Sequence, residues 1–189
     1  MKRVTILGKG SAYMSGEYAI KGLYEIIELI HFRETPGVNF DIVPKSILEE
    51  VKGVDRVIHS SYAISPGPVG EIKRPWYMHT CQSDHLIVLH GKRYVDLYSE
   101  EHGQIEHFVV SPDKIYKNGE LLCDVPAVLS WPPYVFHRIE SKKEGSASMN
   151  FAFRFEGYDV KTNFSIYDLD IQNKTYREIR KGDADQFVK

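Results

Sequence analysis

Two histidines occupy positions where an imidazole could do chemistry. His79 lies in a run of aromatic and polar residues, and His137 comes shortly after two prolines. Successive side chains of a strand point to opposite faces, so Tyr77, His79 and Cys81 are predicted to share one face. Neutral imidazole binds divalent metals or moves protons near neutral pH. We therefore expect the chemistry to centre on His79 and His137, with Tyr77 as a third catalytic candidate.

A carboxylate close to His79 makes a metal site one interpretation. Asp84 and His85 follow a short turn, and on a regular strand they point to opposite faces, so only one of them can join His79. Two histidines and one carboxylate form the ligand set of non-haem iron oxygenases. The prediction is one divalent transition metal (Fe, Mn, Ni or Zn) held by His79, Asp84 and His137. His85 and Cys81 are rival ligands, and the alternative is a metal-free polar pocket.

Short strands separated by turns are expected to position these residues. From residue 54 onward the pattern predicts strands and turns, which is typical of a sandwich or barrel. Asn118-Gly119 marks a tight turn, and a hairpin turning near Asn173-Lys174 is predicted close to the C-terminal end. Pro44 opens the one expected helix and Gly53 stops it. The segment 23–32 is interpreted as a strand because it is rich in β-branched residues. The predicted barrel strands are Arg56–Ile64, Trp76–Cys81, Leu86–Leu89, Arg93–Tyr98, Glu106–Val110, Ala127–Trp131, Val135–Glu140 and Ser148–Phe155.

Composition narrows the function classes. The chain has 189 residues, a net charge of -2 and 42% hydrophobic residues, which suits one globular domain. No basic block supports nucleic-acid binding, and no apolar run reaches the roughly 18 residues of a membrane helix. The two cysteines, Cys81 and Cys123, do not form a disulfide framework, and no secretory signal precedes them. We expect a cytoplasmic protein with reduced thiols.

The order of these residues resembles the two motifs of the cupin superfamily. The first motif is a histidine pair, a carboxylate and a hydrophobic run that ends in glycine, which His79, Asp84 and Gly91 match. The second is Pro-x-Gly-x-x-His, which the stretch from Pro132 to His137 matches. The spacing to Gly91 favours Asp84 over His85 as the residue that faces inward.

The resemblance has departures that weaken the metal assignment more than the fold. Tyr77 replaces the first histidine of the pair, Asp84 stands for the glutamate, and Tyr134 stands for the glycine of the second motif. The resemblance implies an all-β, double-stranded β-helix (jelly-roll barrel) with a short N-terminal extension that contains one helix. Residues 1–55 are assigned to that extension, packing on the barrel, and residues 56–189 to the barrel, in a single domain overall.

A second resemblance, within the same fold, is to the sugar-nucleotide epimerases and ketoisomerases. It covers residues 56–91 and the following Tyr94-Val95-Asp96-Leu97, with Lys73 and Arg74 as the basic residues before the histidine strand. Those enzymes need no metal and use histidine with tyrosine or aspartate as acid and base on a keto-sugar.

These patterns predict a small-molecule enzyme, of oxygenase or isomerase type, with a mononuclear divalent metal in the barrel mouth. One alternative is a metal-independent sugar-nucleotide epimerase or ketoisomerase with His79 as base, and another is a cupin that binds a small ligand without catalysis. The apolar run at residues 24–30 invites pairing with another chain, so a homodimer is predicted whose interface includes part of residues 20–35.

Overall fold

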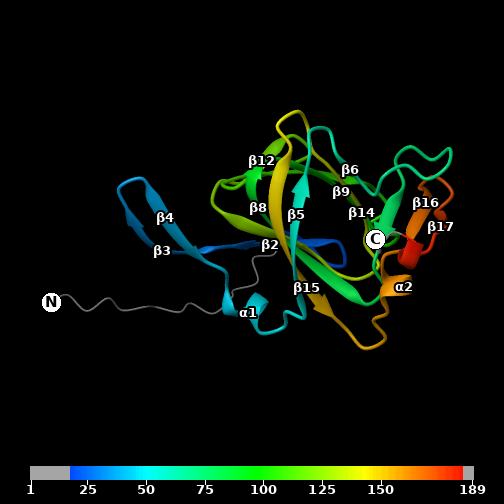
Figure 1. Ribbon diagram of the computed structural model, residues 1–189, viewed down its shortest axis with the longest axis horizontal. Helices are drawn as coiled ribbons and strands as arrows, with labels where there is room; N and C mark the ends of the chain where they lie inside the picture. Colours follow the sequence, from blue (N-terminus) through cyan, green and yellow to red (C-terminus); the bar gives the residue numbers. More distant parts are fainter. Residues whose placement is uncertain (1–17, 185–189) are drawn as a thin grey trace.

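The computed structural model describes residues 18–184, and almost all of their regular structure is antiparallel sheet. Two sheets face each other and form a jelly-roll barrel, which confirms the predicted fold class (Figure 1). Within residues 18–184, no helix is long and apolar enough to cross a membrane. The first sheet contains, in spatial order, β1 (Ala19–Ile20), β2 (Tyr24–Glu28), β13 (Ala127–Trp131), β8 (Gln82–Gly91), β15 (Ser146–Arg154) and β5 (Gly53–His59).

The second sheet carries most of the C-terminal half of the chain. Its strands are, in spatial order, β12 (Glu120–Cys123), β11 (Ile115–Lys117), β10 (Glu106–Val110), β9 (Arg93–Tyr98), β14 (Phe136–Glu140), β7 (Trp76–Met78), β16 (Ile166–Asp170) and β17 (Thr175–Arg180), with β6 (Ile64–Ser65) paired to β14. Two short helical segments, α2 (Val160–Asn163) and a 3-10 turn (Gly182–Ala184), flank β16 and β17 in the chain.

Alternating apolar residues build the core between the sheets. On β9, Val95 and Leu97 are fully buried, and they belong to one cluster with Leu86 of β8, Phe108 of β10 and Leu129 of β13. Strands whose alternate side chains are apolar bury one face each, so two such sheets must pack against each other. The expected strands β9, β10 and β13 occur with the predicted bounds.

Two turns adopt the conformations that their residues favour. Asn118 and Gly119 join β11 to β12 with φ angles of 52° and 88°, as a tight hairpin turn requires. Gly91, the glycine that ends the first motif, has a φ of 70° at the end of β8. A Cβ added there would lie 2.3 Å from the carbonyl oxygen of Gly145, so only glycine fits.

The N-terminal part differs from a simple extension. The predicted helix is only one turn, α1 (Lys45–Leu48), which begins after Pro44 and buries Ile47; it does not continue to Gly53. The predicted strand at residues 23–32 is divided: β2 pairs with β13 inside the first sheet, whereas β3 (Ile30–Thr35) leaves the barrel and pairs with β4 (Val38–Ile42). That hairpin projects away from the barrel (Figure 1), and all six residues of β3 are exposed. Residues 1–17 lie outside the described part of the chain, and the division at residue 55 stays a prediction.

Candidate active site

Neighbouring strands of the second sheet place Tyr77 and His137 side by side. Tyr77 is the central residue of β7 and pairs directly with His137 of β14. Their ring centroids are 5.9 Å apart. Both residues line a cavity inside the barrel, as the alternation of strand side chains predicts.

His79 lies one residue beyond the end of β7 and is fixed by the turn before β14. The backbone N–H of Tyr134 donates to the carbonyl oxygen of His79 at 2.8 Å. Tyr134 has a φ of 66°, so it adopts the left-handed conformation at the position where the cupin motif has glycine. The replacement therefore keeps the turn, and this turn connects the two motifs and brings His79 to within 4.7 Å of His137, measured between ring centroids.

Asp84 reaches the same cavity from the first sheet. It pairs with Trp131 of β13, and its Oδ1 accepts hydrogen bonds from the side-chain amides of Gln82 and Asn150, each at 2.8 Å. Gln82 and Asn150 are site residues that the sequence analysis missed. Their only sequence signal is that each shares a strand face with an inward residue: Gln82 with Asp84, and Asn150 with Ser148.

The two rival ligands lie elsewhere. His85 points to the opposite face of β8, where its ring packs on Phe153 at 3.8 Å and its Nδ1 donates to the carbonyl oxygen of Phe151 at 3.0 Å. Cys81 lies beyond the end of β7, beside Gly157, and does not line the cavity. Neither residue lies with His79 and Asp84 in the cavity, because β7 ends before Cys81 and the regular alternation of β8 turns His85 to the opposite face.

His79, Asp84 and His137 converge on one point. Nε2 of His79 is 3.2 Å and Nε2 of His137 is 4.0 Å from Oδ2 of Asp84. The Nδ1 atoms of the two histidines donate to backbone carbonyl oxygens: that of His79 to Asn163, at the end of α2, and that of His137 to Val135 at 3.1 Å. Each ring is therefore held with Nε2 facing the carboxylate.

Burial and neighbouring charges shift the pKa values of the two histidines in opposite directions. Burial alone would lower the pKa of His79, but the charge of Asp84 and hydrogen bonds to Asp84 and Asn163 outweigh burial and raise the pKa above its ordinary value. The pKa of His137 is lowered to about 4, by burial and then by the charge of His79. Burial opposes ionisation of Asp84, yet its two histidine neighbours hold its pKa well below the ordinary range. The pKa values of the two histidines are therefore driven apart, and at neutral pH Asp84 is a carboxylate and His137 a neutral imidazole.

The same three side chains also fit a divalent transition metal. Their ligand atoms lie within 4.8 Å of one another, and ligands cis to each other on a metal are about 3 Å apart, so a small contraction would close the site. Nε2 of His79, Oδ2 of Asp84 and Nε2 of His137 would hold the ion. A bound metal there would supply Lewis-acid polarisation of a substrate oxygen.

The cavity around this cluster has a volume of about 190 Å³. Strands of both sheets contribute to its wall, and so do residues that lie outside the strands, such as Phe164. Besides the three clustered residues and Tyr77, the lining includes Asp55, His59, Arg93, Trp131, Ser148 and Asn150. A small enclosed space with convergent polar groups is the usual form of a ligand site.

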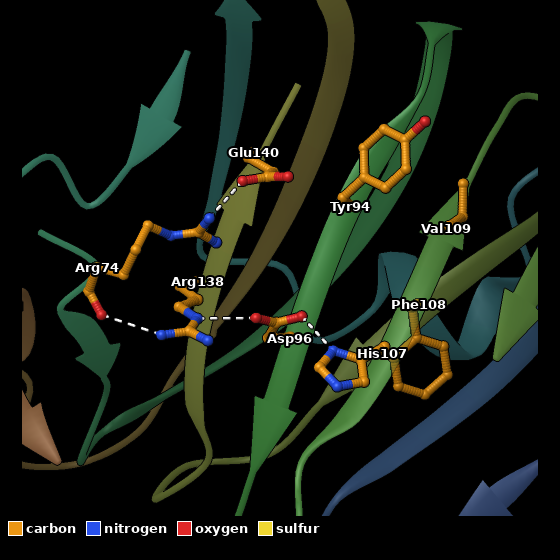
Figure 2. Close-up of a pocket in the computed structure, with 8 residues that line it drawn as sticks. All are labelled: Arg74, Tyr94, Asp96, His107, Phe108, Val109, Arg138 and Glu140. Carbon is orange, nitrogen blue, oxygen red and sulfur yellow. Dashed lines mark hydrogen bonds and ion pairs between the residues drawn. The ribbon is translucent and has the colours of Figure 1, made fainter. Parts of the chain in front are cut away.

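A second hollow lies on the outer face of the second sheet and contains paired charges (Figure 2). Arg138 donates to Asp96 at 2.8 Å, and Asp96 also accepts from His107 at 2.8 Å. Arg74 forms an ion pair with Glu140 at 2.5 Å. Arg74, one of the two basic residues of the sugar-nucleotide resemblance, therefore lines the outer hollow and not the barrel cavity.

Comparisons with known proteins show the fold. No family model matches the chain, and no curated protein matches it in sequence. Among solved structures, the 3,4-ketoisomerase QdtA of Thermoanaerobacterium thermosaccharolyticum, in complex with TDP-4-keto-6-deoxyglucose, is similar with a TM-score of 0.50 and 16% identity, over 75% of this chain and 85% of that one. A dTDP sugar isomerase of Desulfovibrio desulfuricans has a TM-score of 0.51 and 12% identity over 71% and 80%. The rmlC epimerase of Mycobacterium tuberculosis has a TM-score of 0.51 and 10% identity over 74% and 66%. The likeness confirms the cupin-type barrel.

Proposed function

We propose that this protein is a metal-independent isomerase or epimerase that acts on a nucleotide-linked keto-sugar. The observation that carries the proposal is a buried pair of histidines on either side of the Asp84 carboxylate, at 3.2 Å and 4.0 Å from it, with the pKa of His79 raised and that of His137 lowered to about 4. A pair of groups whose pKa values are driven apart can supply an acid and a base at the same pH. The fold likeness to sugar-nucleotide isomerases and epimerases supports the substrate class.

The shared step of such reactions is proton removal from a carbon next to a carbonyl group. In this protein, Nε2 of His137 accepts that proton, because its ring is neutral and its Nδ1 is already a donor to Val135. The electron pair of the broken C–H bond forms a C=C bond, and the carbonyl oxygen becomes an enol oxygen by taking a proton from a donor. Return of a proton to the former carbonyl carbon, with loss of the hydroxyl proton from the carbon that was deprotonated, gives a keto isomer. Return of a proton to the opposite face of the deprotonated carbon, with loss of the enol proton, gives an epimer.

His79 has a different role from the one expected. Both of its ring nitrogens are engaged, Nδ1 with Asn163 and Nε2 with Asp84, so no lone pair of His79 is available to a substrate carbon. His79 instead fixes the carboxylate of Asp84 beside His137. Tyr77 lines the same cavity, with its ring centroid 6.3 Å from that of His79 and 5.9 Å from that of His137, which makes it the proposed proton donor to the substrate oxygen.

In the proposed charge state, the negative charge of Asp84 is balanced and hydrogen-bonded without a metal ion. The imidazolium of His79 neutralises Asp84, and the remaining lone pairs of the carboxylate accept from Gln82 and Asn150. A metal would have to displace the proton between His79 and Asp84. This argument favours the metal-independent reaction over the metal-dependent one.

Incubation with TDP-4-keto-6-deoxyglucose in the presence of EDTA tests the proposal. We expect NMR spectra to show a new keto-sugar isomer or epimer, formed at the same rate with and without the chelator. Loss of activity in EDTA, restored by one divalent metal, would favour the metal-dependent enzyme. Tight binding of the nucleotide sugar with no product under either condition would favour a binding protein without catalysis.

A metal-dependent enzyme of the oxygenase or isomerase type is the second candidate. The specific observation that favours it is the convergence of two imidazole nitrogens and one carboxylate oxygen within 4.8 Å. In that case His79 would be a neutral ligand instead of an imidazolium, and the difference is measurable as metal content per chain.

A further inference from the structure

Arg93 is a buried charge that the proposed proton transfer does not use. It lies on the inward face of β9, has 1% of its surface exposed, and lines the cavity that contains His79 and His137. One of its terminal nitrogens, Nη2, donates to the carbonyl oxygen of Val57 at 3.0 Å. Its Nε has no hydrogen-bond partner, and no carboxylate among the described residues forms an ion pair with it.

A buried guanidinium without a counter-charge is costly for the fold. The other inward residues of β9, Val95 and Leu97, are apolar, so the strand could be buried without a charge at this position. Burial lowers the pKa of Arg93 only to about 10, so the group stays charged at neutral pH. A charge kept at such a cost is typical of a site that is completed by a ligand.

Strand register separates Arg93 from the histidine cluster along the barrel. Asn150, which contacts Asp84, and Ser148 are two residues apart on β15, roughly 7 Å along the strand. Ser148 pairs with Val57, the residue whose carbonyl oxygen binds Arg93. Arg93 therefore reaches the level of Ser148, one layer along β15 from the level of Asp84.

The layer that contains Arg93 and Ser148 offers several hydrogen-bond donors. The hydroxyl of Ser148 is buried and, like Nε of Arg93, has no partner among the described residues. His59 lines the same part of the cavity, and its pKa is lowered to about 4, by burial and then by the charge of Arg93, so it is neutral beside the guanidinium. Among residues 18–184 the cavity has one acidic lining residue besides Asp84, which is Asp55, and it pairs with Asn150 and so lies at the level of Asp84.

We propose that Arg93 and Ser148 form a subsite for a carboxylate on the sugar, so that the substrate is a nucleotide-linked sugar acid. The inference rests on the proposed function, because it takes the reacting sugar to lie between His137 and this layer. A cavity of about 190 Å³ holds a sugar but not the nucleoside and its diphosphate, which must extend to solvent. The anion that meets Arg93 is then a small substituent at the far end of the sugar. A carboxylate accepts two parallel hydrogen bonds from a guanidinium.

Two ligands that differ in one group test the subsite by calorimetry. TDP-glucuronate carries a carboxylate where TDP-glucose carries a hydroxymethyl group. We expect the protein to bind TDP-glucuronate at least about tenfold more tightly, because charge-assisted hydrogen bonds to a buried arginine are strong. Arg93→Met should remove this preference and leave the affinity for TDP-glucose within about twofold. Lys92→Met, at the exposed neighbouring position, should keep it.

Equal affinity of the unchanged protein for the two ligands would overturn the subsite, and that result needs no variant to fold. A folded Arg93→Met protein that loses affinity for TDP-glucuronate and TDP-glucose alike would also overturn the subsite. Arg93 would then support the structure of the barrel and would not bind the carboxylate. Where Arg93→Met does not fold, Ser148→Ala takes its place and should reduce the preference for the carboxylate.

Binding measurements with free glucuronate and free glucose distinguish a failure of the subsite from a failure of the proposed function. Should neither TDP-sugar bind, Arg93-dependent or Ser148-dependent binding of glucuronate alone would support the anion subsite and reject the nucleotide. Absence of glucuronate binding in that case would overturn the subsite as well.

Discussion

Replacing His137 with glutamine should make the unfolding free energy depend less on pH between pH 6.5 and pH 4.5. In the folded protein the pKa of His137 is about 4, below the ordinary value of 6.5. Between these pH values the unfolded chain binds a proton that the folded chain does not, so stability falls as the pH falls. From pH 6.5 to pH 4.5 this single group should remove about 2 kcal/mol of unfolding free energy, a component that His137→Gln lacks.

The other titratable groups of the site do not obscure the effect of His137 between pH 4.5 and pH 6.5. The pKa of His79 is raised, so its contribution is complete below pH 6.5 and is lost only as the pH rises through its folded value. The pKa of Asp84 is lowered, so its contribution is lost only below about 3.8. His59 and His85 also have lowered pKa values, but they remain in both proteins and cancel in the comparison.

Urea denaturation at several pH values between 4.5 and 6.5 measures the effect. The exposed histidine of β8 offers a matched control, because His90→Gln should reproduce the unchanged profile. The reasoning would be refuted if the unfolding free energy changed with pH equally in the original protein and in His137→Gln. His137 would then take up its proton in the folded state as easily as in the unfolded one.

Three further predictions concern the fold, the assembly and the metal. Gly91→Ala should lower the unfolding free energy by more than about 2 kcal/mol, because its Cβ would meet a backbone oxygen. Gly119→Ala, with open space around the added Cβ, should lower it by only about 1 kcal/mol. Thermal or chemical denaturation measures both losses, and equal losses would contradict the argument. Phe32 is 61% exposed on a hairpin that nothing in the described chain covers, so light scattering should show a dimer that Phe32→Asp dissociates, and a monomeric original protein would reject the dimer. Elemental analysis of protein purified without chelators should find less than about one transition metal per ten chains, and one metal per chain that His137→Ala removes would favour the metal-dependent enzyme.

The fold could be predicted from sequence because its signals are local. Period-two alternation marks β9 and β10, a short apolar run marks β13, and the Asn118-Gly119 turn follows from the conformations that those residues tolerate. The projecting hairpin of β3 and β4 could not be predicted, because its apolar residues are exposed and resemble those of a buried strand.

The three-residue cluster was predictable, whereas its environment was not. His79, Asp84 and His137 follow from motif spacing and strand alternation. Their protonation states depend on Asn163 and Val135, whose carbonyl oxygens are invisible in a sequence pattern. Arg93 was missed because an arginine on a strand is ordinarily exposed, and its burial depends on packing between distant strands.

Solvent deuterium exchange into a keto-sugar tests the central claim most directly. With TDP-4-keto-6-deoxyglucose in D₂O and EDTA, we predict that the protein introduces deuterium at the carbon next to the carbonyl group. His137→Asn should slow the exchange by at least about a hundredfold, the usual contribution of a positioned base, while His90→Gln exchanges at the original rate. No incorporation by the unchanged protein, or undiminished incorporation by a folded His137→Asn protein, would contradict the account.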